Sequence, residues 1–115
     1  MTNDSSPDPR APAAAGAAVT TAGEGQAVLT LSGELDASRV RELEEALADS
    51  RLIVARGWLV ELDALRRMDL TCAYALRNAA SRLPAHTPVR IRGANRLVRR
   101  TLRHVGIDAL ATLEG

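Results

Sequence analysis

The amino-acid sequence predicts an α/β fold in which a small mixed β-sheet is covered by helices. Short apolar runs, some with the two-residue period of a strand, alternate with longer runs whose apolar residues recur every three or four positions, as on one face of a helix. Their order along the chain is strand, strand, helix, strand, helix, strand, helix. This order implies right-handed crossover connections that place the helices over the sheet.

Length and composition narrow the possible domain organisation. The 115 residues suffice for one domain with a modest hydrophobic core. Residues 1–16 are rich in Pro, Ala, Ser and Asp without periodicity, so we expect a disordered tail, followed by a domain at residues 17–115. No window holds the roughly 18 apolar residues that span a bilayer, and the Ala-rich stretch 11–19 lacks a preceding basic cluster. We therefore expect a cytoplasmic protein without membrane contact.

Missing residue types disfavour several classes of function. All 15 basic residues are Arg, whereas P-loop proteins and response-regulator receiver domains both use a Lys in their sites. The single Cys cannot form an intramolecular disulfide, and the two His have no metal-site spacing with it. We therefore expect no metal and no other cofactor.

The first half of the domain contains two predicted strands and a helix. Residues 17–22 and 27–31 are extended runs separated by Gly23-Glu24-Gly25-Gln26, which suits a hairpin turn. Residues 32–36 are expected to turn the chain, and Asp36 or Ser38 can cap the helix that follows. One stripe of that helix carries Val40, Leu43, Leu47 and Val54, and its other face is rich in acids.

The central stretch leads from an apolar strand through a short polar loop into a helix. Trp58, Leu59, Val60 and Leu62 form the strand. Asp69 is a good N-cap for a helix whose apolar residues repeat until Pro84 stops it. Thr71 therefore lies in the first turn, where unpaired backbone N–H groups and the macrodipole favour negative charge.

The last third predicts one more strand and one more helix. The strand is built around Val89 and Ile91, and Gly93-Ala94-Asn95 opens a helix that Gly106 ends. The inward residues of this helix are Val98, Leu102 and Val105.

Three stretches of the sequence resemble the STAS family, the anti-sigma factor antagonists. Glu61-Leu62 falls where the family has an acid and a Leu at a strand end, and Asp69-Leu70-Thr71-Cys72-Ala73 falls on a loop that reads Asp-Ser-Ser-Gly-Leu in the family. The stretches LSGELD and HVGIDAL, at residues 31–36 and 104–110, are similar to two further family segments. The resemblance covers residues 17–113 and implies a STAS-like fold.

The resemblance also implies a function and a site. In the family a partner kinase phosphorylates the second Ser of the loop, and Thr71 occupies its place. An acid equivalent to Asp36 takes part in kinase recognition. The implied function is that of an anti-sigma factor antagonist, which binds a GHKL-type serine/threonine kinase acting as an anti-sigma factor and is released by phosphorylation at Thr71. The expected partner-binding residues are Asp36, Asp69, Leu70, Thr71 and Cys72, with the Cys72 side chain in space that a family Gly leaves to the partner.

Other functions remain to be weighed against this one. A constitutive STAS scaffold in a signalling or transport-associated assembly would use Thr71 only as a helix residue. An enzyme with Cys72 as nucleophile and Asp69 as its orienting acid lacks a supporting motif, so we expect no enzymatic activity. Six Arg and no acid lie in residues 90–103, but the chain contains only two aromatic residues that could stack on bases, so we expect no direct nucleic-acid binding. We expect instead a solvated helix face, with some of its charge balanced by the acidic first helix.

Overall fold

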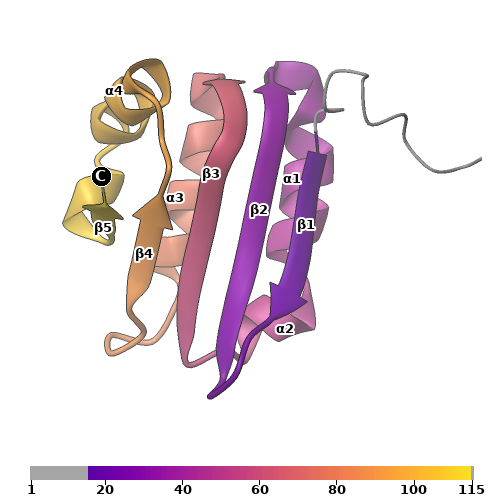
Figure 1. The fold of residues 1–115 in the computed structure, drawn as a ribbon, viewed down its shortest axis with the longest axis vertical. Helices are drawn as coiled ribbons and strands as arrows, with labels where there is room; N and C mark the ends of the chain where they lie inside the picture. The colour runs from indigo at the N-terminus through magenta and orange to yellow at the C-terminus, as the bar shows by residue number, and fades with distance from the viewer. Residues whose placement is uncertain (1–15, 115) are drawn as a thin grey trace, which may run out of the picture.

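The computed structural model describes residues 16–114 and shows one five-stranded sheet with the strand order β1-β2-β3-β4-β5 (Figure 1). Strand β1 runs antiparallel to β2, and the pairs β2–β3, β3–β4 and β4–β5 are parallel, so the predicted mixed sheet is confirmed. The strands are β1 (Gly16–Thr21), β2 (Gln26–Leu35), β3 (Gly57–Met68), β4 (Val89–Arg92) and β5 (Thr112–Glu114). The predicted tail lies outside the described residues except for Gly16, which begins β1.

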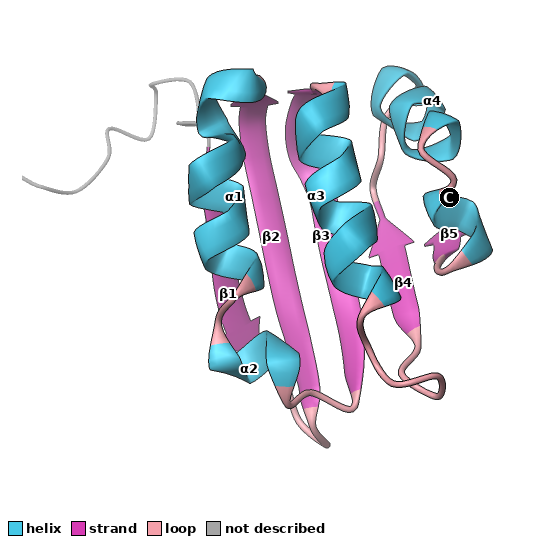
Figure 2. Ribbon diagram, turned by 180° about the vertical axis from the view of Figure 1, so that it is seen from behind, coloured by secondary structure: helices cyan, strands magenta, loops and turns pink. Residues whose placement is uncertain are grey.

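The described helices lie on one face of the sheet, and no helix of residues 16–114 covers the opposite face (Figure 1, Figure 2). Figure 1 views the uncovered face, and Figure 2 shows α1 and α3 in front of the strands from behind. The α-helices are α1 (Val40–Leu47), α2 (Ser50–Ile53), α3 (Leu70–Ser81) and α4 (Arg96–His104), with short 3₁₀ turns η1 (Ala37–Arg39) and η2 (Ile107–Ala109). The order of elements follows the prediction, with β5 added at the end of the described chain.

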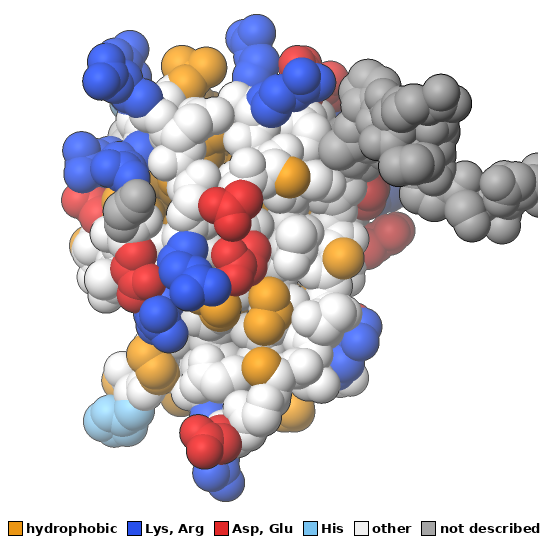
Figure 3. Space-filling view, in the orientation of Figure 1, with side chains coloured by type: hydrophobic (Ala, Val, Ile, Leu, Met, Phe, Trp, Pro, Cys, Tyr) orange, Lys and Arg blue, Asp and Glu red, His pale blue; other side chains and the backbone are white. Residues whose placement is uncertain are grey.

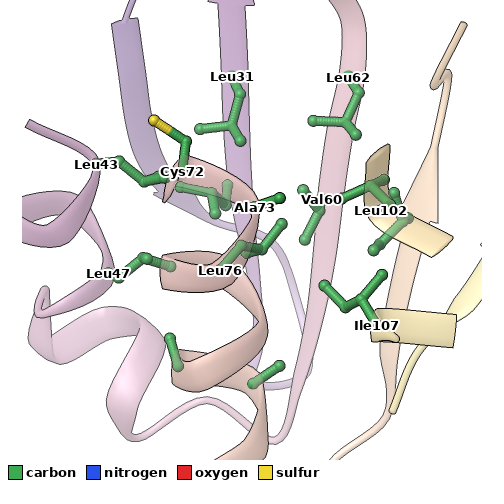
Figure 4. Close-up of a cluster of buried hydrophobic side chains, with 14 of the residues drawn as sticks. Leu31, Leu43, Leu47, Val60, Leu62, Cys72, Ala73, Leu76, Leu102 and Ile107 are labelled. Carbon is green, nitrogen blue, oxygen red and sulfur yellow. The ribbon is translucent and has the colours of Figure 1, made fainter. Parts of the chain in front are cut away.

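The core lies between the sheet and the helices. Figure 4 shows side chains of α3, including Ala73 and Leu76, close to Leu31 of β2 and Val60 of β3. All four of these residues are fully buried. The apolar side chains of the helices and of the strands therefore meet in one layer between the sheet and the helices, as a two-layer domain requires.

The hairpin between β1 and β2 forms as the sequence predicts. Glu24 and Gly25 have φ angles of 64° and 79°, so both central residues of the turn are left-handed. Two such residues make a turn whose twist matches that of the flanking strands. The N–H of Ala22 donates to the carbonyl of Gln26 at 2.9 Å and closes the hairpin.

The two central strands are longer than the sequence indicates. Residues 32–35 were expected to turn, and residues 63–68 to form a loop, yet they pair with each other as the ends of β2 and β3. The pairing contains register shifts after Thr30 and after Gly33, where φ is 75°. In β3 these irregularities break the two-residue alternation of side chains, since the buried residues after Leu62 are Leu65 and Met68. Strand β2 keeps its alternation through Leu35, but Ser32 and Gly33 are residue types typical of turns, which hides its end in the sequence.

The predicted single helix after β2 is two helices with a break between them. Asp49 caps α2 by accepting a hydrogen bond from the N–H of Arg51 at 2.8 Å. The break changes the helical phase, so Leu52 is fully buried and Val54 is 77% exposed. The expectation that Val54 shares the inward stripe with Leu47 is therefore wrong.

Helix α4 is fixed to β3 by its first residues. Asn95 caps the helix by accepting from the N–H of Val98 at 2.8 Å, and its side-chain amide donates to the carbonyls of Leu65 and Arg66 at 3.3 and 3.2 Å. Gly106 ends the helix with φ of 79°, as expected of a left-handed residue after a helix. The start of α4 is thereby held next to the end of β3.

Candidate functional site

The carboxyl ends of β2 and β3 bring two loops together. The two strands are parallel neighbours, and Leu35 pairs with Met68 in their register. The N–H of Asp69 donates to the carbonyl of Leu35 at 2.8 Å. Asp36 and Asp69, which are far apart in the sequence, therefore follow adjacent strand ends, where ligands and partners of open α/β sheets usually bind.

Thr71 lies in the first turn of α3 and is exposed. The Asp69 side chain accepts from the N–H of Thr71 at 2.9 Å, which confirms Asp69 as the N-cap. Within residues 16–114 nothing forms a hydrogen bond with the Thr71 hydroxyl. The hydroxyl is thus open to a partner, at a helix end where backbone N–H groups favour an added negative charge.

Asp36 supplies a second charge to the same surface. Its carboxylate accepts hydrogen bonds from the N–H of Ser38, at 3.0 Å, and from the Ser38 hydroxyl. The hydrogen bond from the Ser38 side chain is the largest cause that lowers the pKa of Asp36. Because Asp36 is ionised near neutral pH and exposed, it presents a fixed negative charge at the site.

Cys72 is buried and does not lie on the surface with Thr71. Its side chain is fully buried, and its Sγ–H donates to the Asp36 carbonyl at 3.3 Å. The expectation that Cys72 occupies space at the partner surface therefore needs correcting, because on the first turn of α3 this position faces the core. The thiol instead joins the start of α3 to the loop that carries Asp36.

The environment of Cys72 also argues against a nucleophile. Burial, followed by the charges of Asp69, Asp36 and Glu44, raises the pKa of the thiol to about 11. The reactive thiolate is then a negligible species near neutral pH.

We expect Cys72 of the native protein to resist iodoacetamide, whereas the denatured protein reacts fully. The folded state holds the thiol pKa at about 11, above the ordinary value of 9.0, so it favours the neutral form. Stability from this group is complete below about pH 9 and is lost as the pH rises toward 11. Mass spectrometry of the alkylated protein over time measures the reaction, and rapid native labelling near neutral pH would contradict the burial of Cys72.

A shallow hollow of about 340 Å³ lies beside the two acids. Its walls combine strand ends with α4, and they are formed by Glu34, Leu35, Asp36, Arg67, Met68, Asp69, Leu70, Leu97 and Thr101. Leu70 is 43% exposed and Leu97 is 50% exposed, so two apolar side chains flank the acids. Sequence reasoning missed Leu97, although an outward Leu on a helix otherwise rich in Arg was a signal.

The described part of the chain has neither a cluster of metal-binding side chains nor a helix that could cross a membrane. Residues 16–114 contain no group of three or more His, Cys, Asp or Glu side chains that could hold a metal ion. In the same range, no helix combines the length and the apolar character needed to cross a bilayer. The site combines the carboxylates of Glu34, Asp36 and Asp69 with the guanidinium of Arg67, the hydroxyls of Thr71 and Thr101, and the exposed apolar side chains of Leu70 and Leu97.

The mixed sheet and the helices on one face define this chain as a two-layer α/β domain. Comparison with solved structures finds the same fold in other proteins. An anti-sigma factor antagonist from Mycobacterium paratuberculosis superposes with a TM-score of 0.75 and 21% identity, over 90% of this chain and 87% of that one. The phosphorylated form of the Bacillus cell fate determinant SpoIIAA gives 0.65 and 16%, over 86% and 91%. A Ser-to-Glu variant of RsbS from Moorella thermoacetica gives 0.64 and 20%, over 85% of each chain.

The family follows from the sequence comparison. The family model described as "Mlab, STAS domain" matches residues 19–113. The chain therefore belongs to the STAS domain family, as the three stretches of its sequence indicated. A search of curated protein sequences finds no match.

Proposed function

We propose that this protein is an anti-sigma factor antagonist: it binds a GHKL-type serine/threonine kinase that acts as an anti-sigma factor, and phosphorylation of Thr71 releases it. The observation that carries the proposal is the exposed hydroxyl of Thr71 on the first turn of α3, between the loops that hold Asp36 and Asp69. Fold neighbours named as anti-sigma factor antagonists support the general role. SpoIIAA was solved in a phosphorylated and an unphosphorylated form, which supports a switch by phosphorylation.

The contacts follow from what the surface offers. Asp36 and Asp69 supply negative charge that a basic kinase surface can pair with, and Leu70 supplies exposed apolar area. Cys72 acts indirectly by holding the Asp36 loop against α3 through its hydrogen bond. Leu97 extends the apolar part of the surface onto α4, because it lines the same hollow as Leu70.

The proposed switch is chemical and local. The kinase transfers the γ-phosphoryl group of ATP to the Thr71 hydroxyl oxygen, and a base of the kinase takes the hydroxyl proton. The phosphate adds about −1.5 to −2 charges beside two carboxylates. The new group must be desolvated against a partner surface shaped for a neutral hydroxyl, so the complex dissociates.

We expect affinity capture with the unmodified protein, from the cytoplasm of its native cell, to retain a serine/threonine kinase, and added ATP to release it. Mass spectrometry of the released protein is expected to place a phosphate on the peptide that contains Thr71. Thr71→Val is the control, because it keeps the β-branched shape but has no hydroxyl to modify, so its complex should persist in ATP. A captured assembly that contains no kinase, or that ATP leaves intact with Thr71 unmodified, would favour the constitutive scaffold.

A further inference from the structure

The outer face of α4 is a stripe of arginine side chains. Val98 and Leu102 form the buried side of this nine-residue helix. Four Arg are related by spacings of three or four residues, since Arg99 and Arg100 follow Arg96 by three and four and precede Arg103 by four and three. They therefore share the opposite side of the helix. Figure 3 shows basic side chains gathered over α4 at the upper left of the molecule. We refer to these four residues as the α4 arginine cluster.

The α4 arginine cluster has no countercharge in the described chain. Within residues 16–114, none of its members forms an ion pair. Arg90 and Arg92 on the neighbouring strand differ, because they pair with Glu114 and Glu61 at 2.7 and 2.6 Å. The expectation that the acidic first helix balances the cluster is wrong, since α1 and α4 lie on either side of α3 (Figure 2).

The four side chains surround a hollow of about 480 Å³. Its walls are Ala94 and the α4 arginine cluster, without any carboxylate. The Nε–H of Arg99, one of these lining residues, is buried and finds no acceptor among the described residues. A buried donor without an acceptor is unfavourable, and so is a cation at Arg96, the first residue of the helix and the positive end of its dipole. A bound anion would relieve both.

We propose that this hollow is a binding site for a phosphoryl group that carries two negative charges. A guanidinium group donates two parallel hydrogen bonds to a carboxylate or phosphate, but only the tetrahedral phosphate offers oxygens to several guanidinium groups at once. Four converging Arg therefore favour a phosphate monoester or pyrophosphate over a carboxylate. A single-stranded nucleic acid would also need aromatic side chains to stack its bases, and aromatic residues make up 2% of this chain.

Free phosphorylated molecules and lipid headgroups share this chemistry, so the test separates them. Calorimetric titration with inorganic pyrophosphate at low ionic strength measures the free anion. Co-sedimentation with phosphatidylcholine vesicles, with and without phosphatidate, measures the headgroup. The double variant Arg99→Gln/Arg100→Gln is expected to weaken binding at least tenfold in whichever arm the wild type binds. Tighter binding to phosphatidate vesicles than to pyrophosphate assigns the site to a headgroup, and the reverse assigns it to a free ligand.

The control is Arg41→Gln/Arg82→Gln, which removes the same charge from exposed Arg outside the hollow. It is expected to bind within twofold of the wild type. Equal weakening by both double variants would overturn the proposal, because net charge alone would then explain binding. Absence of wild-type binding in both arms would overturn it too. A short DNA duplex that binds tenfold more tightly than either probe, and loses affinity in Arg99→Gln/Arg100→Gln, would replace it with a nucleic-acid surface.

Discussion

Thr71→Asp is expected to weaken binding of the partner kinase at least about tenfold while the fold persists, which corresponds to about 1.4 kcal/mol or more of binding free energy. Within the domain the new charge has opposing effects of similar size. The positive end of α3 favours it by about 0.3–1 kcal/mol, and Asp69, whose side chain accepts from the N–H of Thr71, opposes it. At the partner surface no such compensation exists, because the charge must leave water to reach a site shaped for a hydroxyl.

Calorimetric titration against the purified kinase, together with melting curves of each variant, measures this prediction. Thr71→Val should bind like the wild type, since it lacks the hydroxyl but adds no charge. Thr20→Asp places the same charge on an exposed strand residue away from the site and should also bind normally. Equal affinities for Thr71→Asp and the wild type would contradict the switch, and an equal loss for Thr20→Asp would reduce it to an effect of net charge.

Trp58→Ala is expected to lower the free energy of unfolding by about 3–5 kcal/mol, the usual cost of truncating a large buried aromatic residue. Trp58 is 2% exposed, and its indole N–H donates to the carbonyl of Leu52 at 2.9 Å. Trp58, the second residue of β3, therefore joins the start of this strand to α2 through both packing and a buried hydrogen bond. Since domains of this size are stable by about 5–15 kcal/mol, the loss is a large fraction of the total.

Chemical denaturation followed by circular dichroism measures the loss, and two variants separate its causes. Trp58→Phe keeps much of the apolar volume but removes the indole N–H that donates to the Leu52 carbonyl, which still accepts from the N–H of Ala55 at 3.3 Å. About 0.5–1.5 kcal/mol should therefore be lost. Leu59→Ala changes the next residue, which is only partly buried on the uncovered face of the sheet, and should cost less than Trp58→Ala. A Trp58→Ala variant as stable as Leu59→Ala would show that this corner of the core contributes little.

Local chemistry in the sequence is sufficient for the elements whose ends are set by a cap or a turn. Asp69 caps α3, Asn95 caps α4, and Gly23 to Gln26 closes the hairpin, all as the residue types indicate. Each of these choices depends on hydrogen bonds and backbone angles within a few residues, so a single sequence contains the information. The same holds for the exposed position of Thr71 in a first helical turn.

Tertiary pairing decided the features that local patterns do not express. The ends of β2 and β3 are strands because they pair with each other. The irregular register erases the alternation that would have marked the end of β3, and Ser32 and Gly33 give the end of β2 the composition of a turn. Leu52 replaces Val54 in the core because the chain breaks at Asp49, which changes the phase of the helix. The strand pairing depends on contacts that are distant in the sequence. The break at Asp49 is instead a local cap that the spacing of the apolar residues does not reveal.

Some features of the site follow from local sequence, and others follow from tertiary contacts. The sequence by itself determined the site's chemistry: a hydroxyl at a helix start next to the N-cap acid Asp69, and a second acid, Asp36, at the possible cap of an earlier helix. Only the tertiary structure decided that the two loops are joined, that the Cys72 thiol donates to the Asp36 carbonyl, and that Leu97 of α4 borders the hollow. The reason is physical: adjacency of parallel strands and the packing of α4 are long-range contacts, while capping and helix dipoles act over a single turn.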